Sequence, residues 1–230
     1  MSKSHSVWVP WVTVMVTMAA VTALSRLLPP SAEATGVAAA FLGPAWLWVW
    51  HHEDSRVKEY GLALGGLMLH DRRGALVGMG RSAIVLIIVT FVVLVPYVFV
   101  YRWWRHLLGP VQWAYAWQGV LRDAPGQVLM VALPEEVFFR GYLQTALDRQ
   151  FVTKRRVFGA HVGLSLLVTS AIFAVGHLLT RPYPERLAVF LPSLLFGWMR
   201  ARTGGVGASI VFHALCNLVA AALVRGLTPA

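Results

Sequence analysis

The stretch SAIVLIIVTFVVLVPYVFVY, residues 82–101, is twenty residues long and contains no charged side chain. A helix that crosses the hydrocarbon core of a bilayer needs about 20 mostly apolar residues. Inside a bilayer, a single segment satisfies its own backbone polar groups only as a helix. The stretch therefore predicts a membrane-spanning helix, and it sets the fold class expected for the rest of the chain.

The composition agrees with a polytopic membrane protein. Of 230 residues, 57% are hydrophobic and 13% are charged, and the mean hydropathy is +0.63. Segments that come close to spanning length lie at 7–24, 34–50, 82–101, 125–147, 157–179, 187–199 and 207–224. We therefore predict an all-α membrane helix bundle with about seven transmembrane helices.

Two intervening segments are too polar to span. Residues 51–81 are rich in charge and glycine and predict a cytoplasmic loop with a short surface helix. Residues 102–119 mix tryptophan with arginine, which is typical of a segment lying in the membrane interface. This second segment could instead be half of an eighth span.

Basic residues outnumber acidic ones by 20 to 10. They occur in small clusters between apolar runs, which is unlike a nucleic-acid-binding face and excludes that class. With the N-terminus inside, about twelve Lys and Arg lie on the cytoplasmic side and about seven on the other, as the positive-inside rule prefers. The bilayer is the expected partner. We expect one membrane domain, 1–230, with N-terminal spans in 1–122 and a catalytic core in 123–225.

Few ionisable residues remain inside the apolar segments: Glu135, Glu136, Arg140, His177 and His213. Placing such a side chain in hydrocarbon costs about 2.5 to 3.5 kcal/mol of free energy unless the side chain is paired or hydrated. Each of these residues is therefore a candidate functional residue. Glu136 and Arg140 are spaced i, i+4 on one helical face, whereas Glu135 points about 140° away from Arg140. The spacing predicts a Glu136–Arg140 ion pair and leaves Glu135 as the candidate general base.

Three further features belong to the same core. Pro134 lacks an N–H and removes the helical partner of the Met130 carbonyl, which predicts a local irregularity beside the glutamates. The two histidines occur in FAVGH and HALCN, so Phe173–His177 and His213–Asn217 are each i, i+4 pairs. An asparagine in this position can orient a histidine or donate to a reacting oxygen.

Together the motifs EEVFFR, FAVGH and HALCN resemble the EExxxR, FxxxH and HxxxN pattern of the CAAX protease and bacteriocin-processing family of glutamic-type membrane endopeptidases. The resemblance extends over residues 127–224. It implies that Glu135 and His177 activate a water while His213 and Asn217 stabilise the oxyanion, and that Arg140 holds Glu136. It implies neither a cofactor nor a metal.

The resemblance also implies a type of substrate and a location. The expected substrate is a membrane-associated protein or peptide, cleaved near its C-terminus. In the prenyl-protein endopeptidase of this family the cavity is reached from the cytosol, and other members resemble bacteriocin-processing, self-immunity or myxosortase-like sorting proteins. The compact size favours a prokaryotic plasma membrane.

Alternatives remain open on the residues alone. Two histidines and a carboxylate could hold a catalytic zinc, although HExxH is absent. Cys216 near His213 could be a nucleophile, but a small apolar filler is the favoured interpretation of a lone cysteine. A non-catalytic immunity or transport protein could use the same polar cluster for binding.

One geometric difficulty follows from the spacing of the histidines. Counting along the segments places His177 and His213 about 10 Å apart in depth, so the helices must be unequal, tilted or irregular if both face one site. We expect the short sixth segment not to cross fully. We also expect a water-filled cavity among spans four, five and seven.

Overall fold

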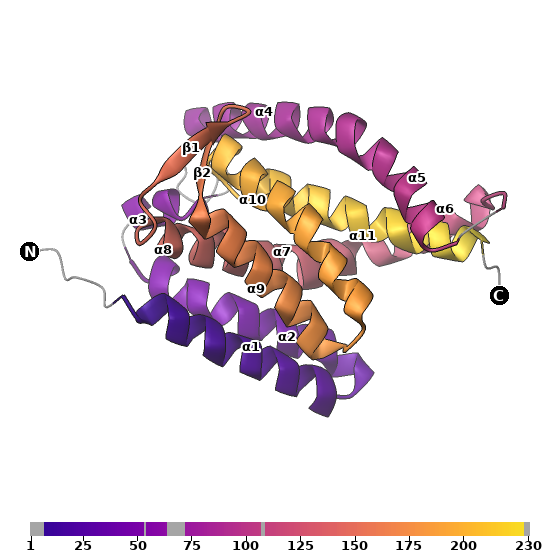
Figure 1. The fold of residues 1–230 in the computed structure, drawn as a ribbon, viewed down its shortest axis with the longest axis horizontal. Coiled ribbons are helices and arrows are strands. Elements are labelled where there is room, and N and C mark those ends of the chain that lie inside the picture. Colours follow the sequence, from indigo (N-terminus) through magenta and orange to yellow (C-terminus); the bar gives the residue numbers. More distant parts are fainter. Residues whose placement is uncertain (1–6, 53, 64–71, 107–108, 228–230) are drawn as a thin grey trace, which may run out of the picture.

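The computed structural model describes residues 7–52, 54–63, 72–106 and 109–227 as a helix bundle with one small hairpin (Figure 1). The α-helices are α1 (Val9–Leu27), α2 (Pro30–Ala45), α3 (Asp54–Glu59), α4 (Arg72–Val89), α5 (Val95–Trp104), α6 (Trp113–Gly126), α7 (Leu133–Glu136), α8 (Gln144–Asp148), α9 (Leu164–Thr180), α10 (Phe190–Thr203) and α11 (Gly207–Leu227). Shorter segments with π-helical hydrogen bonding are η1 (Trp46–Trp50), η3 (Thr90–Leu94), η4 (Gln127–Ala132) and η5 (Val137–Leu143). A 3₁₀ segment, η6 (Pro184–Val189), precedes α10.

The predicted fold class, an all-α membrane helix bundle, is confirmed. Every predicted segment falls largely on helix. Within the described ranges, three helices are long and apolar enough to cross a membrane by themselves: Val9–Leu27, Arg73–Trp104 and Gly207–Gly226. The chain is therefore an integral membrane protein.

The sixth segment forms a short α-helix. Its helix, α10, has 14 residues and is about 21 Å long, shorter than a hydrocarbon core of roughly 30 Å. Gly204, in the left-handed region at φ +81°, ends this helix and turns the chain into α11.

The polar loop between the second and third spans contains the predicted short helix, α3. Residues 53 and 64–71 of this loop lie outside the described residues. The following helix begins earlier than expected, because α4 starts at Arg72 rather than at residue 82.

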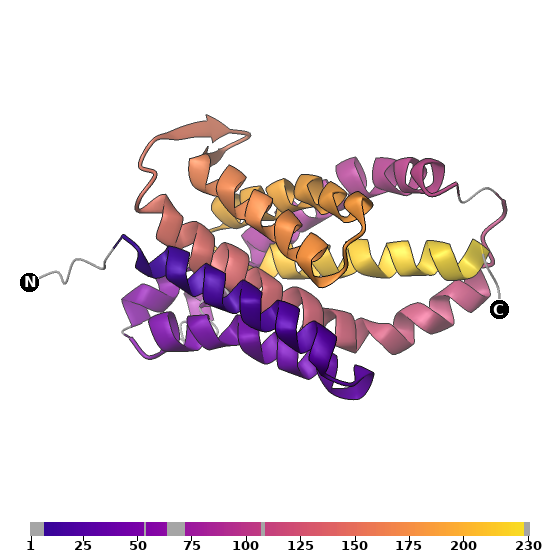
Figure 2. The same cartoon turned by 60° about the horizontal axis from the view of Figure 1, so that its bottom comes forward.

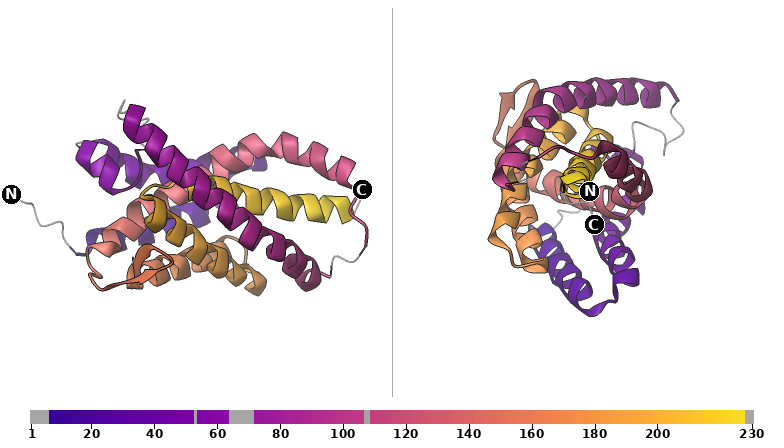
Figure 3. Two further views of the ribbon diagram at one scale, coloured as in Figure 1. Left: turned by 90° about the horizontal axis from the view of Figure 1, so that it is seen from above. Right: turned by 90° about the vertical axis from the view of Figure 1, so that its right-hand side faces the viewer.

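The helix that carries the two glutamates is longer than expected. From Trp113 to Asp148 it is continuous through α6, η4, α7, η5 and α8. Part of the predicted interfacial segment therefore extends the fourth span, and α6 lies alongside α11 (Figure 3). Pro134 lies between η4 and η5, so the predicted irregularity takes the form of helical widening on both sides of the proline.

The start of the fifth span differs from the prediction. Strand β1 (Lys154–Val157) pairs in antiparallel register with β2 (Ala160–Gly163), and helix α9 begins only at Leu164. Residues Phe158 and Gly159 form the turn with positive φ. A basic run followed by a glycine turn favours an exposed hairpin over a helix in the bilayer.

The bundle has two ends. One end holds α3, the hairpin and the Gly204 turn. The Arg149–Glu59 ion pair at 2.6 Å links α3 to the residue after α8, and the Val206 N–H to Gly61 carbonyl bond at 3.1 Å links the residues after α3 to those after the Gly204 turn. We call this end the basic end. At the opposite end α1 and α9 finish and α2 begins, and Arg26 donates to the Leu179 carbonyl at 2.8 Å (Figure 2).

Candidate active site

The site is built around a buried ion pair on the long helix. Glu136 and Arg140 are 0% and 1% exposed, with 3.4 Å between Arg140 Nε and Glu136 Oε2, in the predicted i, i+4 relation. The Arg140 guanidinium also donates to Ser193 on α10, at 2.8 Å to Oγ and 3.2 Å to the carbonyl. Its carbon lies 4.5 Å from the centroid of the Phe173 ring. Arg140 thus ties the long helix to both α9 and α10.

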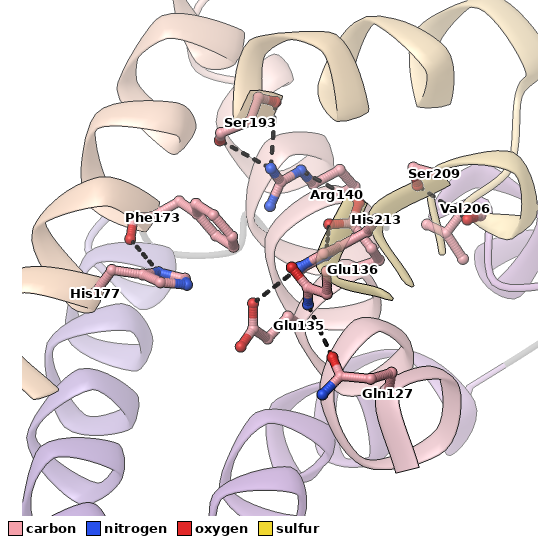
Figure 4. A network of polar contacts seen from close by, with 11 residues as sticks. Gln127, Glu135, Glu136, Arg140, Phe173, His177, Ser193, Val206, Ser209 and His213 are labelled. Carbon is pink, nitrogen blue, oxygen red and sulfur yellow. Dashed lines mark hydrogen bonds and ion pairs between the residues drawn. The ribbon is translucent and has the colours of Figure 1, made fainter. Parts of the chain in front are cut away.

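His213 lies between the two glutamates (Figure 4). Its Nδ1 is 3.0 Å from Glu136 Oε1, and its Nε2 is 3.9 Å from Glu135 Oε2. Because a carboxylate accepts, His213 Nδ1–H donates to Glu136, and this bond fixes the orientation of the ring. Glu136 therefore has two partners, where the sequence suggested only Arg140.

Glu135 points away from the ion pair and into a pocket of about 150 Å³. Its side chain is 13% exposed, and no hydrogen-bond partner is found for its Oε2 among the described residues. His177 and Phe173 line the same pocket. A carboxylate with a free acceptor atom beside an imidazole is an arrangement that can accept a proton from water.

His177 lies near the end of α9 and bonds through Nδ1 to the Phe173 carbonyl at 3.0 Å. A carbonyl only accepts, so Nδ1 carries the hydrogen and the neutral ring has its lone pair on Nε2. The Phe173 ring lies between the histidines, with its centroid 4.4 Å from that of His177 and 6.0 Å from that of His213. Phe173 therefore sets the spacing of the two imidazoles.

The expected difference in depth between the histidines is removed by helix tilt. Helix α9 is tilted relative to α11 in Figure 1. The same number of residues therefore covers a shorter distance along the bundle in α9 than in α11. His177, late in α9, and His213, early in α11, consequently lie beside the same ring.

The pocket is not placed as expected among spans four, five and seven. Besides the long helix and α9, it is lined by α1 and α2, through Met18, Val21, Thr22, Ser25, Glu33, Val37 and Phe41. No described residue of α11 lines it. The α1–α2 hairpin packs against α9 and the long helix and so forms this side of the pocket, while α11 lies behind the glutamates.

Asn217 is not brought to the pocket. It lies one turn beyond His213 on α11, and its Nδ2 donates to Gln127 Oε1 at 3.1 Å. Asn217 and Gln127 therefore join α11 to the start of η4.

Several site residues were not predicted from the sequence. Ser193 is the partner of Arg140, and Arg186 and Glu33 line the pocket. Glu33, in the first turn of α2, resembles an ordinary carboxylate at a helix N-terminus. Ser193 was detectable in principle, since a hydroxyl within the apolar stretch FLPSLLFG needs a partner.

The candidate metal ligands are the His, Cys, Asp and Glu side chains. Within the described part of the chain, no group of three His, Cys, Asp or Glu side chains could hold a metal ion.

Comparison with known proteins shows one similarity, in the C-terminal half of the chain. Residues 116–219 match the family described as type II CAAX prenyl endopeptidase Rce1-like. This range contains Glu135, Glu136 and Arg140 together with both histidine motifs. No curated protein and no solved structure matches the chain. Over residues 116–219, somewhat less than half of its length, the chain is therefore similar to the Rce1-like type II CAAX prenyl endopeptidases.

Proposed function

We propose that the chain is a glutamic-type intramembrane endopeptidase in which Glu135 is the general base. The observation that carries the proposal is the position of Glu135, which faces the pocket beside His177 while its Oε2 lies 3.9 Å from His213 Nε2. Glu136 is unsuited to the same role, because it is completely buried and held by Arg140 and His213.

In the proposed reaction, a water in the pocket is held between Glu135 and the Nε2 lone pair of His177. Glu135 takes a proton from the water, and the water oxygen attacks the carbonyl carbon of the peptide bond. The proton then passes from Glu135 to the leaving amine nitrogen, and the carbon–nitrogen bond breaks. The products are a new carboxyl terminus and a new amine.

The developing oxyanion needs hydrogen-bond donors. His213 is held by Glu136 through Nδ1, and a protonated ring would donate from Nε2. Asn217 is the second proposed donor, and this role requires its amide to leave Gln127. Arg140 and Glu136 are positioning residues that fix His213, and Phe173 separates the two imidazoles.

We further propose a membrane-associated protein or peptide as substrate, cleaved near its C-terminus, and no nucleic-acid partner. We place the chain in a prokaryotic plasma membrane, and the distribution of basic residues supports a cytoplasmic N-terminus. Among the functions found in the family, the chain's own residues do not favour the myxosortase-like sorting branch over the others.

The test is Glu135→Gln in reconstituted vesicles. This variant keeps the shape of the side chain and its hydrogen bonding but removes the base, so we expect kcat to fall by about 10²–10⁴ while substrate remains bound. Glu59→Gln is the matched control, because Glu59 pairs with Arg149 at the basic end, outside the pocket. Full activity of Glu135→Gln would refute the proposal.

The Glu135→Gln protein also provides a way to identify the substrate. An uncleaved substrate should remain bound to this variant and be recoverable for mass spectrometry. Zinc-dependent hydrolysis is the alternative mechanism, and it predicts that chelation abolishes activity and that added zinc restores it.

A further inference from the structure

The pocket around Glu135 opens at one particular end of the bundle. Its outer lining is polar and comes from the last turns of α1 and α9, the first turn of α2 and the residues after α9, namely Thr22, Ser25, Glu33, Thr180, Arg181 and Arg186. Phe173 lies about 10 Å deeper than Thr180 along α9. The mouth therefore lies at the end opposite the basic end, with the reacting groups below it.

The mouth has a fixed shape because arginines hold the end of α9. The Arg186 Nε–H donates to the His177 carbonyl at 3.1 Å, and Arg26 donates to the Leu179 carbonyl, two residues further along α9. Thr180 Oγ1 donates to the same His177 carbonyl at 3.0 Å. These contacts fix the backbone of His177 from the side on which the pocket opens.

Toward the basic end the path to Glu135 is filled. In the next two turns of the long helix, Phe138, Tyr142 and Leu143 are buried, with 0–2% of their surface exposed. Leu62, which is 1% exposed, packs in the same cluster. These side chains form one contiguous apolar cluster with Tyr60 and Val57 of the α3 region. A peptide cannot reach Glu135 through this packed layer without unfolding it.

The charges indicate which end faces the cytoplasm. The described basic residues at the basic end include Arg56, Lys58, Arg149, Lys154, Arg155, Arg156, Arg200 and Arg202. Those near the opposite end are Arg26, Arg102, Arg105, Arg122, Arg181, Arg186 and Arg225, while Lys3 lies outside the described residues. By the positive-inside rule the basic end is cytoplasmic.

We propose that substrate enters the Glu135 pocket from the extracytoplasmic face of the membrane. The proposal rests on the proposed function, and it defines the substrate class as a polypeptide segment that has already been translocated, such as the outer tail of a membrane-anchored protein. It differs from the cytosolic access implied by the resemblance to the prenyl-protein endopeptidase.

The experiment uses thiol labelling of the full chain. In a Cys216→Ser background, Ser25→Cys places a thiol at the mouth, and Val152→Cys places one at the basic end, where Val152 is 80% exposed. Thr180→Cys repeats the mouth measurement from a second helix. Spheroplasts of a bacterial host that expresses each variant are treated with a membrane-impermeant maleimide, before and after permeabilisation.

We expect Ser25→Cys and Thr180→Cys to be labelled in intact spheroplasts, with no gain on permeabilisation. Val152→Cys should be labelled only after permeabilisation. Labelling of the mouth positions only after permeabilisation would overturn the proposal, whichever result Val152→Cys gives. Labelling of both ends in intact spheroplasts would overturn it as well.

Labelling does not depend on catalysis, so the outcome is independent of the proposed function. The Glu135→Gln protein carrying Ser25→Cys should label as the parent does, even though it no longer cleaves. A failure of Glu135→Gln to change cleavage would refute the mechanism and leave the access result intact.

Discussion

Removing Arg140 should destabilise the bundle far more than removing any surface arginine. The Arg140→Met variant leaves Glu136, which is 0% exposed, without its cationic partner, and it also removes two bonds to Ser193. Breaking one partner of a buried ion pair costs about 3–5 kcal/mol, because the remaining charge stays in a low-dielectric environment. We expect a loss of that size in the free energy of unfolding.

The structure supplies two comparisons for this prediction. Arg149 pairs with Glu59 at side-chain exposures of 39% and 51%, so Arg149→Met should cost less than about 1 kcal/mol. The double variant Glu136→Gln/Arg140→Met removes both charges but keeps an acceptor for His213 Nδ1. It should therefore recover part of the stability lost in Arg140→Met.

The assay is reversible unfolding in mixed detergent micelles with an increasing mole fraction of denaturing detergent, followed by circular dichroism. The three variants and the parent are measured at equal protein concentration. If Arg140→Met and Arg149→Met lose the same free energy, or if the double variant is less stable than Arg140→Met, the assignment of a buried, mutually compensating pair is wrong.

Two further changes test neighbouring contacts. Cys216→Ser should leave kcat/KM within about twofold of the parent, because Cys216 packs in the apolar cluster with Phe196 and Phe212; loss of all activity would transfer the chemistry from Glu135 to the thiol. Ser193→Ala removes a 2.8 Å bond to the Arg140 guanidinium, and it should lower the free energy of unfolding by about 1.5–3 kcal/mol in the same micelle assay; an unchanged stability would show that the Ser193 hydroxyl does not support Arg140.

Local spacing predicted much of the site. The i, i+4 rule placed Glu136 against Arg140 and Phe173 against His177, and both relations appear in the structure. Such pairs depend only on helical geometry, which the sequence determines. The different directions in which Glu135 and Glu136 point follow from the same geometry.

Contacts between distant elements could not be predicted in the same way. Nothing local indicates that the α1–α2 hairpin lines the pocket or that Ser193 meets Arg140, because both depend on how helices pack. Apolar content also concealed the hairpin before α9, since Val157, Ala160 and Val162 are compatible with strand and helix alike. The tilt of α9, which brings His177 level with His213, is again a property of packing.

The π-helical segments around Pro134 determine how the later side chains of the long helix are oriented. A π-type turn accommodates an additional residue in an otherwise α-helical path, and such turns often mark functional sites. If regular α-helical hydrogen bonding replaced this turn in η5 with the same number of residues, all later side chains would be rotated by about 100°. Gln144, which donates to the Gly197 carbonyl, and Asp148, which pairs with Lys154, would then face away from their partners. The π-type turn in η5 therefore sets the direction in which the side chains of α8 face.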